Sequence, residues 1–413
     1  MAEESVNNIV VIGGGFAGLW SAIGAVRKLD ELGIGPDRVK VILINRDAWH
    51  GIRVRYYESD LSQMRVPLAS VLEPTGIRQI EGDVIGIDPT ARQVAIQTAD
   101  GQRAVTYDRL ILAAGSRVYL PDIPGLAAHG FNIDTYDEAA RLDRQLRALS
   151  ARAPAEGRDT VLVIGAGLTG IEVACEMPAR LKDAGIGAGR VILADRLPHI
   201  GSDMGESARP VIDQALDGLG IETRTAIDVA TIDESGVTLK DGERISAFTL
   251  VWCAGMVASP LAACLPGTRD RWGRLPVDEF MKVKGLDDVY AAGDIAAAMM
   301  DDQHTSVMSC QHARPMGRFA GHNAVSDLLG VDQLPLRNDF YSTCLDLGPA
   351  GAVQTKGWVR SVFETGEAAK ETKQTINCIR IYPPKSGDRT EILEAAAPVI
   401  QAPAGRVGKA SHA

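Results

Sequence analysis

A glycine-rich segment occurs twice in the chain, 152 residues apart. Asn8–Gly18 (NIVVIGGGFAG) matches Thr160–Gly170 (TVLVIGAGLTG), and each copy places G-x-G-x-x-G directly after a short apolar run. In each copy a second apolar run follows and ends in polar residues, Asn45-Arg46 and Asp195-Arg196. Short β-branched runs of this kind are typical of buried parallel strands. The repeat therefore predicts two β-α-β units.

The glycines of this pattern indicate dinucleotide binding. The first glycine permits a tight turn, the second lets the backbone approach a pyrophosphate, and the third lets helix and strand pack closely. The pyrophosphate then binds the free N–H groups at the amino terminus of the helix. Two copies in register, each between two strands, are much stronger evidence than one G-x-G-x-x-G alone. We expect an α/β fold with two Rossmann-like domains, one holding a flavin and the other a nicotinamide nucleotide.

Composition excludes several other classes of protein. Fifty-three acidic and 43 basic residues give a net charge of −10, the wrong sign for holding nucleic acid by phosphate neutralisation. Six cysteines, never closer than eleven positions, exclude CxxC pairs and clustered zinc sites, and no histidine spacing indicates a metal ligand. The chain has no signal-peptide pattern and no long apolar run free of Gly and Pro. We expect a cytoplasmic protein with reduced thiols.

Further motifs resemble those of a known family. The order GGGFAG, LILAAGS, PDIPG, GAGLTG, VWCAG, YAAGDIA over residues 7 to about 330 resembles the two-dinucleotide flavoproteins, which include the disulfide reductases and the type II NADH dehydrogenases. The resemblance implies that the first glycine box and the Gly-Asp segment hold FAD. The implied FAD residues are Gly13, Gly14, Gly15, Phe16, Ala17, Gly18, Asn45, Arg46, Arg53, Ala114, Gly115, Gly293 and Asp294.

Two of these positions have a physical rationale of their own. Asp294 at a helix start is suited to accept a hydrogen bond from a ribitol hydroxyl, and a plain helix cap is the alternative. Asn45 stands where the family usually has an acid, and its amide still offers an acceptor to a ribose hydroxyl. Arg53 and Arg55 are expected to line the flavin pocket, unless they belong to a strand or loop surface.

By the same resemblance the second box binds the nicotinamide nucleotide, through Gly165, Gly167, Gly170, Asp195 and Gly255. A carboxylate at position 195 favours the free 2′-hydroxyl of NADH and repels a 2′-phosphate. Arg196 argues for NADPH, which remains the alternative. Glu172 lies two residues beyond Gly170. The resemblance implies that it reaches toward flavin and nicotinamide, and a first-turn carboxylate that complements the helix dipole is the simpler alternative.

The absence of cysteine from the segment His50–Leu61 restricts the possible electron acceptors. Disulfide reductases need CxxxxC beside the flavin, so dithiol chemistry there is excluded. Sulfide:quinone oxidoreductases also need cysteines beside the flavin. Cys175 is a candidate, but its helical spacing is typical of a buried structural cysteine, which is the preferred interpretation.

Ser309–Gly317 (SCQHARPMG) is similar to the AQxAxQ quinone motif of type II NADH dehydrogenases. Gln311 and Ala313 match it, whereas Cys310 and Pro315 replace the first Ala and the last Gln. We expect Gln311 to donate a hydrogen bond to a carbonyl or to the flavin edge, and His312 to be a proton source for a reduced quinone. The alternatives are an exposed helix glutamine and a structural histidine.

These patterns predict the following domains: an FAD domain at 1–120 and 285–332, an NAD(P)H domain at 121–284, a carboxyl-terminal interface domain at 333–385 and a poorly ordered tail at 386–413. Short strands are expected from Leu336 to Trp358, with a further apolar run at Ile376–Ile381. In the family this region mediates dimerisation or membrane contact, which implies a homodimer. The tail lacks a basic amphipathic face, so peripheral membrane contact has no support from the sequence.

We therefore expect an FAD-dependent NAD(P)H dehydrogenase that reduces a quinone-like acceptor. The alternatives are a reductase of a small electron-carrier protein, similar to ferredoxin reductases, and a non-catalytic redox sensor that responds to NADH.

Overall fold

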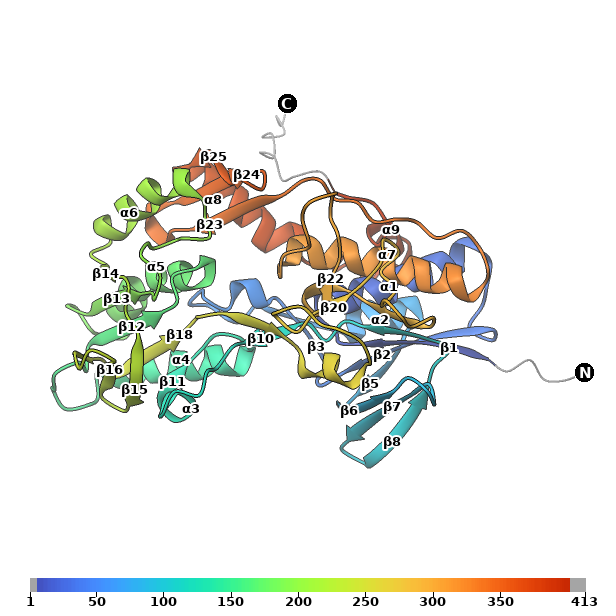
Figure 1. Cartoon of the computed structure of the whole chain (residues 1–413), viewed down its shortest axis with the longest axis horizontal. Coiled ribbons are helices and arrows are strands. Elements are labelled where there is room, and N and C mark those ends of the chain that lie inside the picture. Colours follow the sequence, from blue (N-terminus) through green and yellow to red (C-terminus); the bar gives the residue numbers. More distant parts are fainter. Residues whose placement is uncertain (1–5, 402–413) are drawn as a thin grey trace, which may run out of the picture.

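The computed structural model describes residues 6–401 and arranges them in two nucleotide-binding units and a carboxyl-terminal unit (Figure 1). Each nucleotide-binding unit contains a five-stranded parallel sheet, so the predicted pair of Rossmann-like folds is confirmed. The carboxyl-terminal unit lies over the second unit, beside helices α5 (Leu168–Asp183) and α6 (Arg209–Gly218) (Figure 1).

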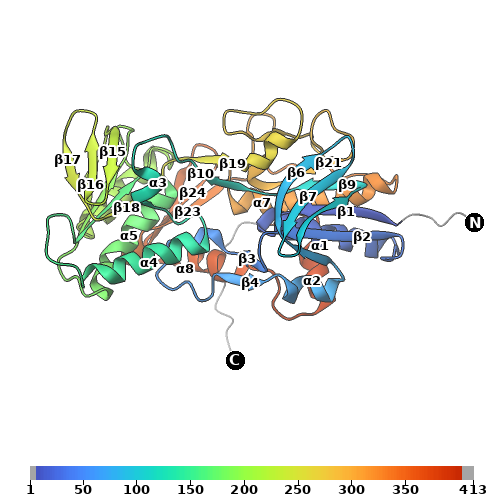
Figure 2. The ribbon, with the colours of Figure 1, turned by 90° about the horizontal axis from the view of Figure 1, so that it is seen from below.

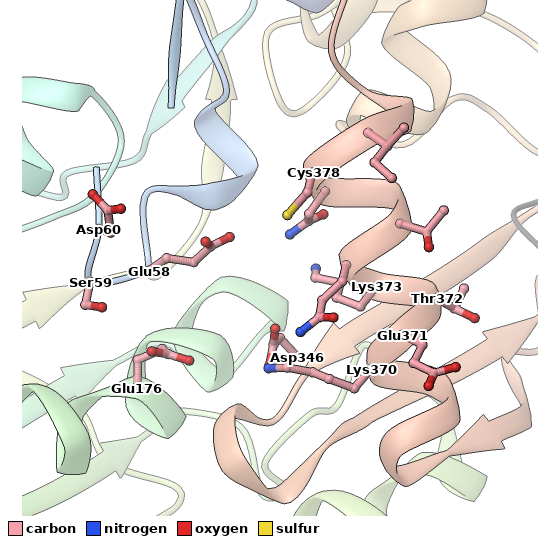
Figure 3. Close-up of a pocket in the computed structure, with 14 residues that line it drawn as sticks. Glu58, Ser59, Asp60, Glu176, Asp346, Lys370, Glu371, Thr372, Lys373 and Cys378 are labelled. Atoms are coloured by element: carbon pink, nitrogen blue, oxygen red, sulfur yellow. The ribbon is translucent and has the colours of Figure 1, made fainter. Parts of the chain in front are cut away.

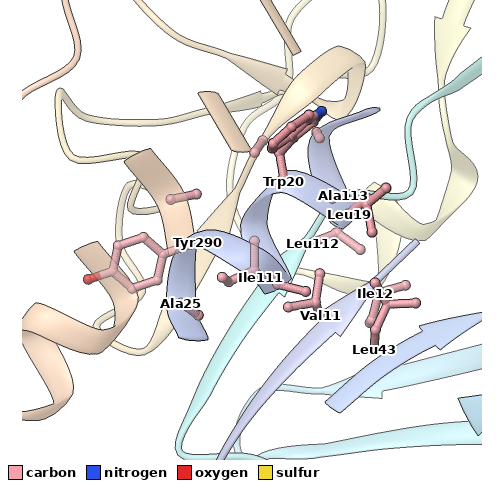
Figure 4. Close-up of a cluster of buried hydrophobic side chains, with 14 of the residues drawn as sticks. Val11, Ile12, Leu19, Trp20, Ala25, Leu43, Ile111, Leu112, Ala113 and Tyr290 are labelled. Atoms are coloured by element: carbon pink, nitrogen blue, oxygen red, sulfur yellow. The ribbon is translucent and has the colours of Figure 1, made fainter. Parts of the chain in front are cut away.

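The sheet of the first unit has the strand order β21-β9-β1-β2-β5. The strands are β1 (Asn7–Ile12), β2 (Val39–Asn45), β5 (Arg78–Glu81), β9 (Arg109–Leu112) and β21 (Val289–Ala291). Helix α1 (Phe16–Glu31) connects β1 to β2, and its apolar face meets the sheet in the cluster that Figure 4 shows. Val11 and Ile12 lie there beside Leu112 and Leu19, and Tyr290 of β21 completes the cluster.

Glycines bring helix α7 (Cys310–Leu328) into close contact with α1. A β-carbon on Gly317 would lie 2.2 Å from the carbonyl oxygen of Ala17, and one on Gly321 would lie 2.1 Å from that of Ser21. No larger residue fits at either position, because packed interiors leave no free volume of that size. Part of the high glycine content therefore serves helix packing and not nucleotide binding.

The second unit repeats this arrangement with the strand order β11-β18-β12-β13-β14. The strands are β11 (Gly130–Phe131), β12 (Thr160–Ile164), β13 (Arg190–Ala194), β14 (Glu222–Arg224) and β18 (Thr249–Trp252). Helix α5 joins β12 to β13 as α1 joins β1 to β2, and α4 (Tyr136–Leu149) precedes β12. The two β-α-β units predicted from the repeat are therefore structurally equivalent.

A small antiparallel sheet accompanies each parallel sheet. The first unit has β6 (Asp83–Asp88), β7 (Gln93–Thr98) and β8 (Gly101–Thr106), and the second has β15 (Val229–Asp233), β16 (Gly236–Leu239) and β17 (Arg244–Ser246). The shorter elements are β3 (Trp49–Gly51), β4 (Arg65–Pro67), α2 (Ala69–Thr75), α3 (Leu126–His129), β20 (Leu275–Pro276) and β22 (Ala296–Ala297).

The chain crosses between the units on two paired strands. β10 (Ser116–Val118) leaves the first unit, and β19 (Met256–Ala258) returns antiparallel to it (Figure 2). After β19, Leu265, Leu275 and Val277 pack in the core of the first unit. The expected boundary at 284 is therefore too late, because the chain returns at β19 and its next apolar residues fill the first core.

The carboxyl-terminal unit contains β23 (Ser342–Asp346), β24 (Ala352–Lys356) and β25 (Ser361–Thr365), in an antiparallel sheet that helix α8 (Gly366–Thr375) covers. The apolar run at Ile376–Ile381 does not form a strand. Residues Ile376–Arg380 extend α8 as one π-helical turn, η6.

The expected poorly ordered tail is wrong for residues 389–395, which form helix α9 (Arg389–Ala395). The Asp388 side chain caps this helix by accepting a hydrogen bond from the Glu391 N–H at 2.8 Å. Ile392 and Leu393 are buried against the first unit, next to α1 and α2, which explains why so short a helix is ordered. Residues 402–413 lie outside the described part of the chain. Among residues 6–401, none of the helices combines the length and apolar character that a bilayer span requires.

Candidate functional site

The first glycine loop leaves one position open. A β-carbon on Gly18 would lie 1.7 Å from the carbonyl oxygen of Gly13, and Gly13 itself has φ +105° and lies against the backbone of Ala113. Gly15 is the N-cap of α1, and nothing lies within 4 Å of a β-carbon placed on it. No side chain caps the first N–H groups of this helix. The outer two glycines are thus required by packing. The middle one leaves space over free N–H groups, where a pyrophosphate fits.

The second glycine loop has the same geometry with one difference. Gly165 has φ +103°, and a β-carbon on Gly170 would lie 1.7 Å from the Gly165 carbonyl oxygen. Gly167 is the N-cap of α5. A β-carbon on Gly167 would lie 3.4 Å from Oδ2 of Asp203, whereas one on Gly15 would meet no described atom within 4 Å.

Asn45 and Asp195 stabilise the two glycine loops in the same way. Asn45 Oδ1 accepts a hydrogen bond from the Gly14 N–H at 2.7 Å, and Asp195 Oδ2 accepts one from the Ala166 N–H at 2.6 Å. The sequence predicted contacts to ribose for both residues, but this bracing of the loop was missed. The signal that could have revealed it is that both residues stand at the end of the second strand of their β-α-β unit, as Asn45 ends β2 and Asp195 directly follows β13. Arg46, also expected at FAD, pairs with Asp83 at 2.8 Å on the surface.

The carboxyl ends of β1, β9 and β21 bring the predicted FAD segments to one edge of the sheet. Gly13 follows β1, Ala114 and Gly115 follow β9, and Gly293 follows β21. Phe16 and Ala17 begin α1 at the same edge. A β-carbon on Gly293 would lie 2.7 Å from the Ala17 β-carbon and 3.5 Å from that of Ala313, so the start of α7 also belongs to this edge. Gly255 directly precedes the crossing strand β19, and its carbonyl accepts a hydrogen bond from the Tyr119 N–H at 3.0 Å.

A charged network joins the two nucleotide units beside this edge. Arg53 donates to the Ser116 hydroxyl at 2.9 Å and pairs with Asp134 of the second unit. Ser116 donates to Asp294 Oδ2 at 2.6 Å, and Arg53 lies 3.7 Å from the same oxygen. Burial raises the pKa of Asp294, while Arg53 and the Ser116 hydrogen bond oppose that rise. Asp134 carries no motif, so the sequence could not identify it.

The first turn of α7 holds three buried polar groups with no hydrogen-bond partner among the described residues. They are Ser309 Oγ, Gln311 Nε2 and His312 Nε2. The His312 Nδ1 accepts from the Val307 N–H at 2.8 Å, and burial lowers the pKa of His312 to about 4. His312 is therefore neutral at pH 7, so it offers an Nε2–H and no imidazolium proton. Buried donors without acceptors are rare in native proteins, so this group indicates a ligand.

His50, from the segment expected near the flavin, is also completely buried. Its Nδ1 donates to the Gly14 carbonyl at 2.8 Å, and its ring lies edge-on to Phe16 with 5.2 Å between centroids. Burial lowers the pKa of His50 to about 4. The Nε2 has no partner among the described residues, next to the first glycine loop.

Glu172 does not contact the glycine loops but joins the second unit to the carboxyl-terminal unit. Its Oε1 accepts from Lys373 Nζ at 2.7 Å and from the Asp346 N–H at 3.1 Å. Both side chains of the ion pair are buried. Burial raises the pKa of Glu172, and the Lys373 cation opposes that rise. Lys373 lies far from every recognised motif and was missed by the sequence analysis.

A cavity of about 690 Å³ reaches Lys373 of this pair from the surface (Figure 3). It lies between the loop Glu58–Asp60, Glu176 of α5, Asp346 at the end of β23, and α8. Asp346, which lines the cavity, accepts a hydrogen bond from the Tyr57 hydroxyl at Oδ2, at 3.1 Å. The cavity therefore gives solvent access to a buried network that begins at Lys373.

The cysteines form no disulfide in the described part of the chain. Cys175 is buried, and burial raises its pKa far above the ordinary value, so it is unsuited to thiolate chemistry. Among residues 6–401, no group of three or more His, Cys, Asp and Glu side chains is arranged to hold a metal ion.

Comparison with known proteins gives consistent matches. The model of the pyridine nucleotide-disulphide oxidoreductase family matches residues 7–317. An NADH dehydrogenase-like protein of Mycobacterium tuberculosis is 52% identical over 401 residues, which cover 96% of this chain and 99% of that protein. A type II NADH:quinone oxidoreductase of the same organism is 30% identical over 70% of this chain and 66% of that protein.

Among solved structures, NDH2 of Plasmodium falciparum in complex with NADH superposes with a TM-score of 0.76. The identity is 12%, over 95% of this chain and 98% of that one. At this identity the likeness supports the fold alone.

Proposed function

The chain belongs to the pyridine nucleotide-disulphide oxidoreductase family, and we propose that it is an FAD-dependent dehydrogenase that oxidises NADH and reduces a quinone-like acceptor. The observation that carries the proposal is the combination of two equivalent glycine loops with the unpartnered donors at the start of α7. The loops provide two dinucleotide sites, and the donors lie at the edge where the first loop ends.

The residues of the first unit fit FAD. The space over Gly15 and the free N–H groups of α1 suit its pyrophosphate, while Gln311 and His312 are suited to donate to carbonyl groups of the flavin or of an acceptor. Bound FAD supplies the redox chemistry by taking a hydride from the nicotinamide and returning two electrons to the acceptor. The protein contributes orientation and exclusion of water.

In the second unit Gly167 and Asp195 are proposed to bind NADH. Because the Asp195 carboxylate braces the loop through the Ala166 N–H, it is fixed where a 2′-phosphate would meet its negative charge. We therefore propose NADH over NADPH as the hydride donor.

Protons for the acceptor are proposed to come from solvent through the cavity at Lys373. Oxidation of NADH with reduction of a quinone to a quinol consumes one proton from solution for each hydride transferred. Glu172 is suited to take up that proton, because burial raises its pKa and its partner Lys373 lines the cavity. His312 is not proposed as the proton source, since burial keeps its imidazole neutral.

The proposal is tested by spectroscopy of the purified protein. We expect bound flavin with a yellow spectrum, bleaching by NADH without oxygen, and reoxidation by menadione or a soluble ubiquinone analogue. A protein that binds no flavin, or whose flavin NADH does not bleach, would contradict the proposal. Reoxidation by a ferredoxin and not by quinones would instead assign a carrier-protein reductase, and slow reoxidation by every acceptor would assign a sensor.

A further inference from the structure

The turn between β24 and β25, residues 357–360, contacts both nucleotide units. On one side the Trp358 ring stacks on His304 of the first unit, with 4.3 Å between centroids and planes 3° apart. On the other side the Arg360 carbonyl accepts from Ser207 Oγ at 3.3 Å, and Ser207 accepts from the Val362 N–H at 3.0 Å. The carboxyl-terminal unit therefore reaches across the two units through this one turn.

Arg360 has an unusual backbone and an incompletely satisfied side chain. Its φ is +58°, a left-handed conformation that residues other than glycine seldom adopt. Its Nη1 is buried and has no hydrogen-bond acceptor among the described residues. The guanidinium also lies over the Tyr341 ring, 5.3 Å from its centroid. The guanidinium thus keeps an unused donor at a buried nitrogen.

Arg360 lies beside the segment Asp203–Gly205, which borders the second glycine loop. A β-carbon on Gly205 would lie 2.9 Å from the Arg360 carbonyl oxygen, and Asp203 stands two residues earlier on the same segment. Asp203 is the carboxylate that lies 3.4 Å from a β-carbon on Gly167, over the N-cap of α5. Although Asp203 is exposed, neighbouring atoms partly desolvate its carboxylate and raise its pKa, and the charge of Arg360 opposes that rise. The corresponding position over Gly15 in the first loop has no such carboxylate.

We propose that Arg360 binds the pyrophosphate of the nicotinamide nucleotide, in competition with Asp203, so that the carboxyl-terminal unit completes the second dinucleotide site. A guanidinium matches phosphate oxygens in charge and in its fork of donors. Asp203 presents a negative charge to the same guanidinium and lies beside the helix terminus that the pyrophosphate needs. Binding then supplies a phosphate acceptor to Arg360, whose Nη1 has none among the described residues, and brings that phosphate near the negative charge of Asp203. This inference rests on the proposed use of NADH.

The test is equilibrium binding of NAD⁺ and of ADP-ribose to the flavin-loaded protein by calorimetry. Arg360→Gly is the suitable variant, because glycine tolerates the positive φ and preserves the turn. We expect it to weaken both ligands about tenfold, the loss of one charge-assisted contact. Arg360→Lys should recover part of the affinity, and Asp203→Asn should tighten binding, since it removes the competing charge. Arg103→Ala, which removes an exposed cation from β8 of the first unit, is the control for net charge.

Kinetics and spectroscopy supply a second readout. Arg360→Gly should raise the KM for NADH and leave kcat at saturation unchanged, because the lost contact is the same in the ground and transition states. Unchanged affinity in Arg360→Gly, or weaker binding in Asp203→Asn, would overturn the inference. Failure of NADH to bleach the wild-type flavin would instead refute the proposed function, so the two failures are distinguishable.

Discussion

Lys373 Nζ lies 2.7 Å from Glu172 Oε1 in the protein interior, so helix α8 of the carboxyl-terminal unit is joined to α5 of the second nucleotide unit by a buried ion pair. The two residues are 201 positions apart. Glu172 also accepts a hydrogen bond from the Asp346 N–H, and Lys373 donates one to the Cys344 carbonyl at 3.0 Å. The carboxyl-terminal unit is thus attached by polar contacts as well as by its apolar core.

Removing one member of this ion pair should reduce the stability of the protein more than removing both. Lys373→Met leaves the Glu172 carboxylate buried without its cation, which costs about 3 kcal/mol. We expect the thermal midpoint of the flavin-loaded protein to fall by several degrees, and the double variant Lys373→Met with Glu172→Leu to recover much of that loss. A double variant that is less stable than Lys373→Met alone would contradict this account. The midpoints are compared at one scan rate.

The glycines of the first loop should separate into two functional classes. Gly18→Ala places a β-carbon 1.7 Å from a carbonyl oxygen, so we expect it to disrupt the packing of α1 and to yield little folded protein. Gly15→Ala meets nothing within 4 Å and should fold, with an unchanged circular dichroism spectrum, but retain less flavin because its methyl group occupies the pyrophosphate space. Full flavin content in purified Gly15→Ala would argue against FAD at this loop.

His50 should make stability dependent on pH below neutrality. Burial lowers the pKa of His50 to about 4, below the 6.5 of an exposed histidine, so the unfolded chain binds the extra proton first. The contribution of His50 is complete above pH 6.5 and is lost as the pH falls toward 4, with about 2 kcal/mol lost at pH 5. His50→Gln keeps a donor for the Gly14 carbonyl and does not titrate. We expect its thermal midpoint to fall less between pH 7 and pH 5 than that of the wild type, and equal falls would refute the assignment.

Arg318 should be replaceable without loss of stability. It is 1% exposed, its Nε and Nη2 have no acceptor among the described residues, and burial lowers its pKa to about 9. Its cation–π contact with Trp20, at 4.4 Å, is worth about 2 kcal/mol, less than the several kcal/mol that desolvation of an ion costs. We therefore expect Arg318→Met to match or exceed the thermal midpoint of the wild type.

The matched control for Arg318 is Arg109, which is partly buried and paired with Asp327 at 2.6 Å. Arg109→Met leaves that carboxylate with only Lys282, so its thermal midpoint should fall. If the thermal midpoint of Arg318→Met falls as far as that of Arg109→Met, the prediction is wrong. The cation–π contact or another interaction of Arg318 then outweighs the cost of its desolvation.

The sequence was most informative where interactions are local. The clash that requires glycine at position 18 is with the carbonyl of Gly13, five residues earlier, so the motif alone predicts the turn, and the same clash between Gly170 and Gly165 predicts the second turn. Helix α9 shows the limit of composition. Its cap at Asp388 is local, but its order depends on Ile392 and Leu393 being buried against α1 and α2, which no pattern in the tail reveals.

The sequence by itself determined the two Rossmann-like units and their order, because the turn, the helix start and the strand pairing of each unit form within a single β-α-β segment. Only the tertiary structure decided which charges meet. Arg53 with Asp134 and Glu172 with Lys373 each join different units. The physical reason is that an ion pair depends on distance in space, and the packing of whole units sets those distances.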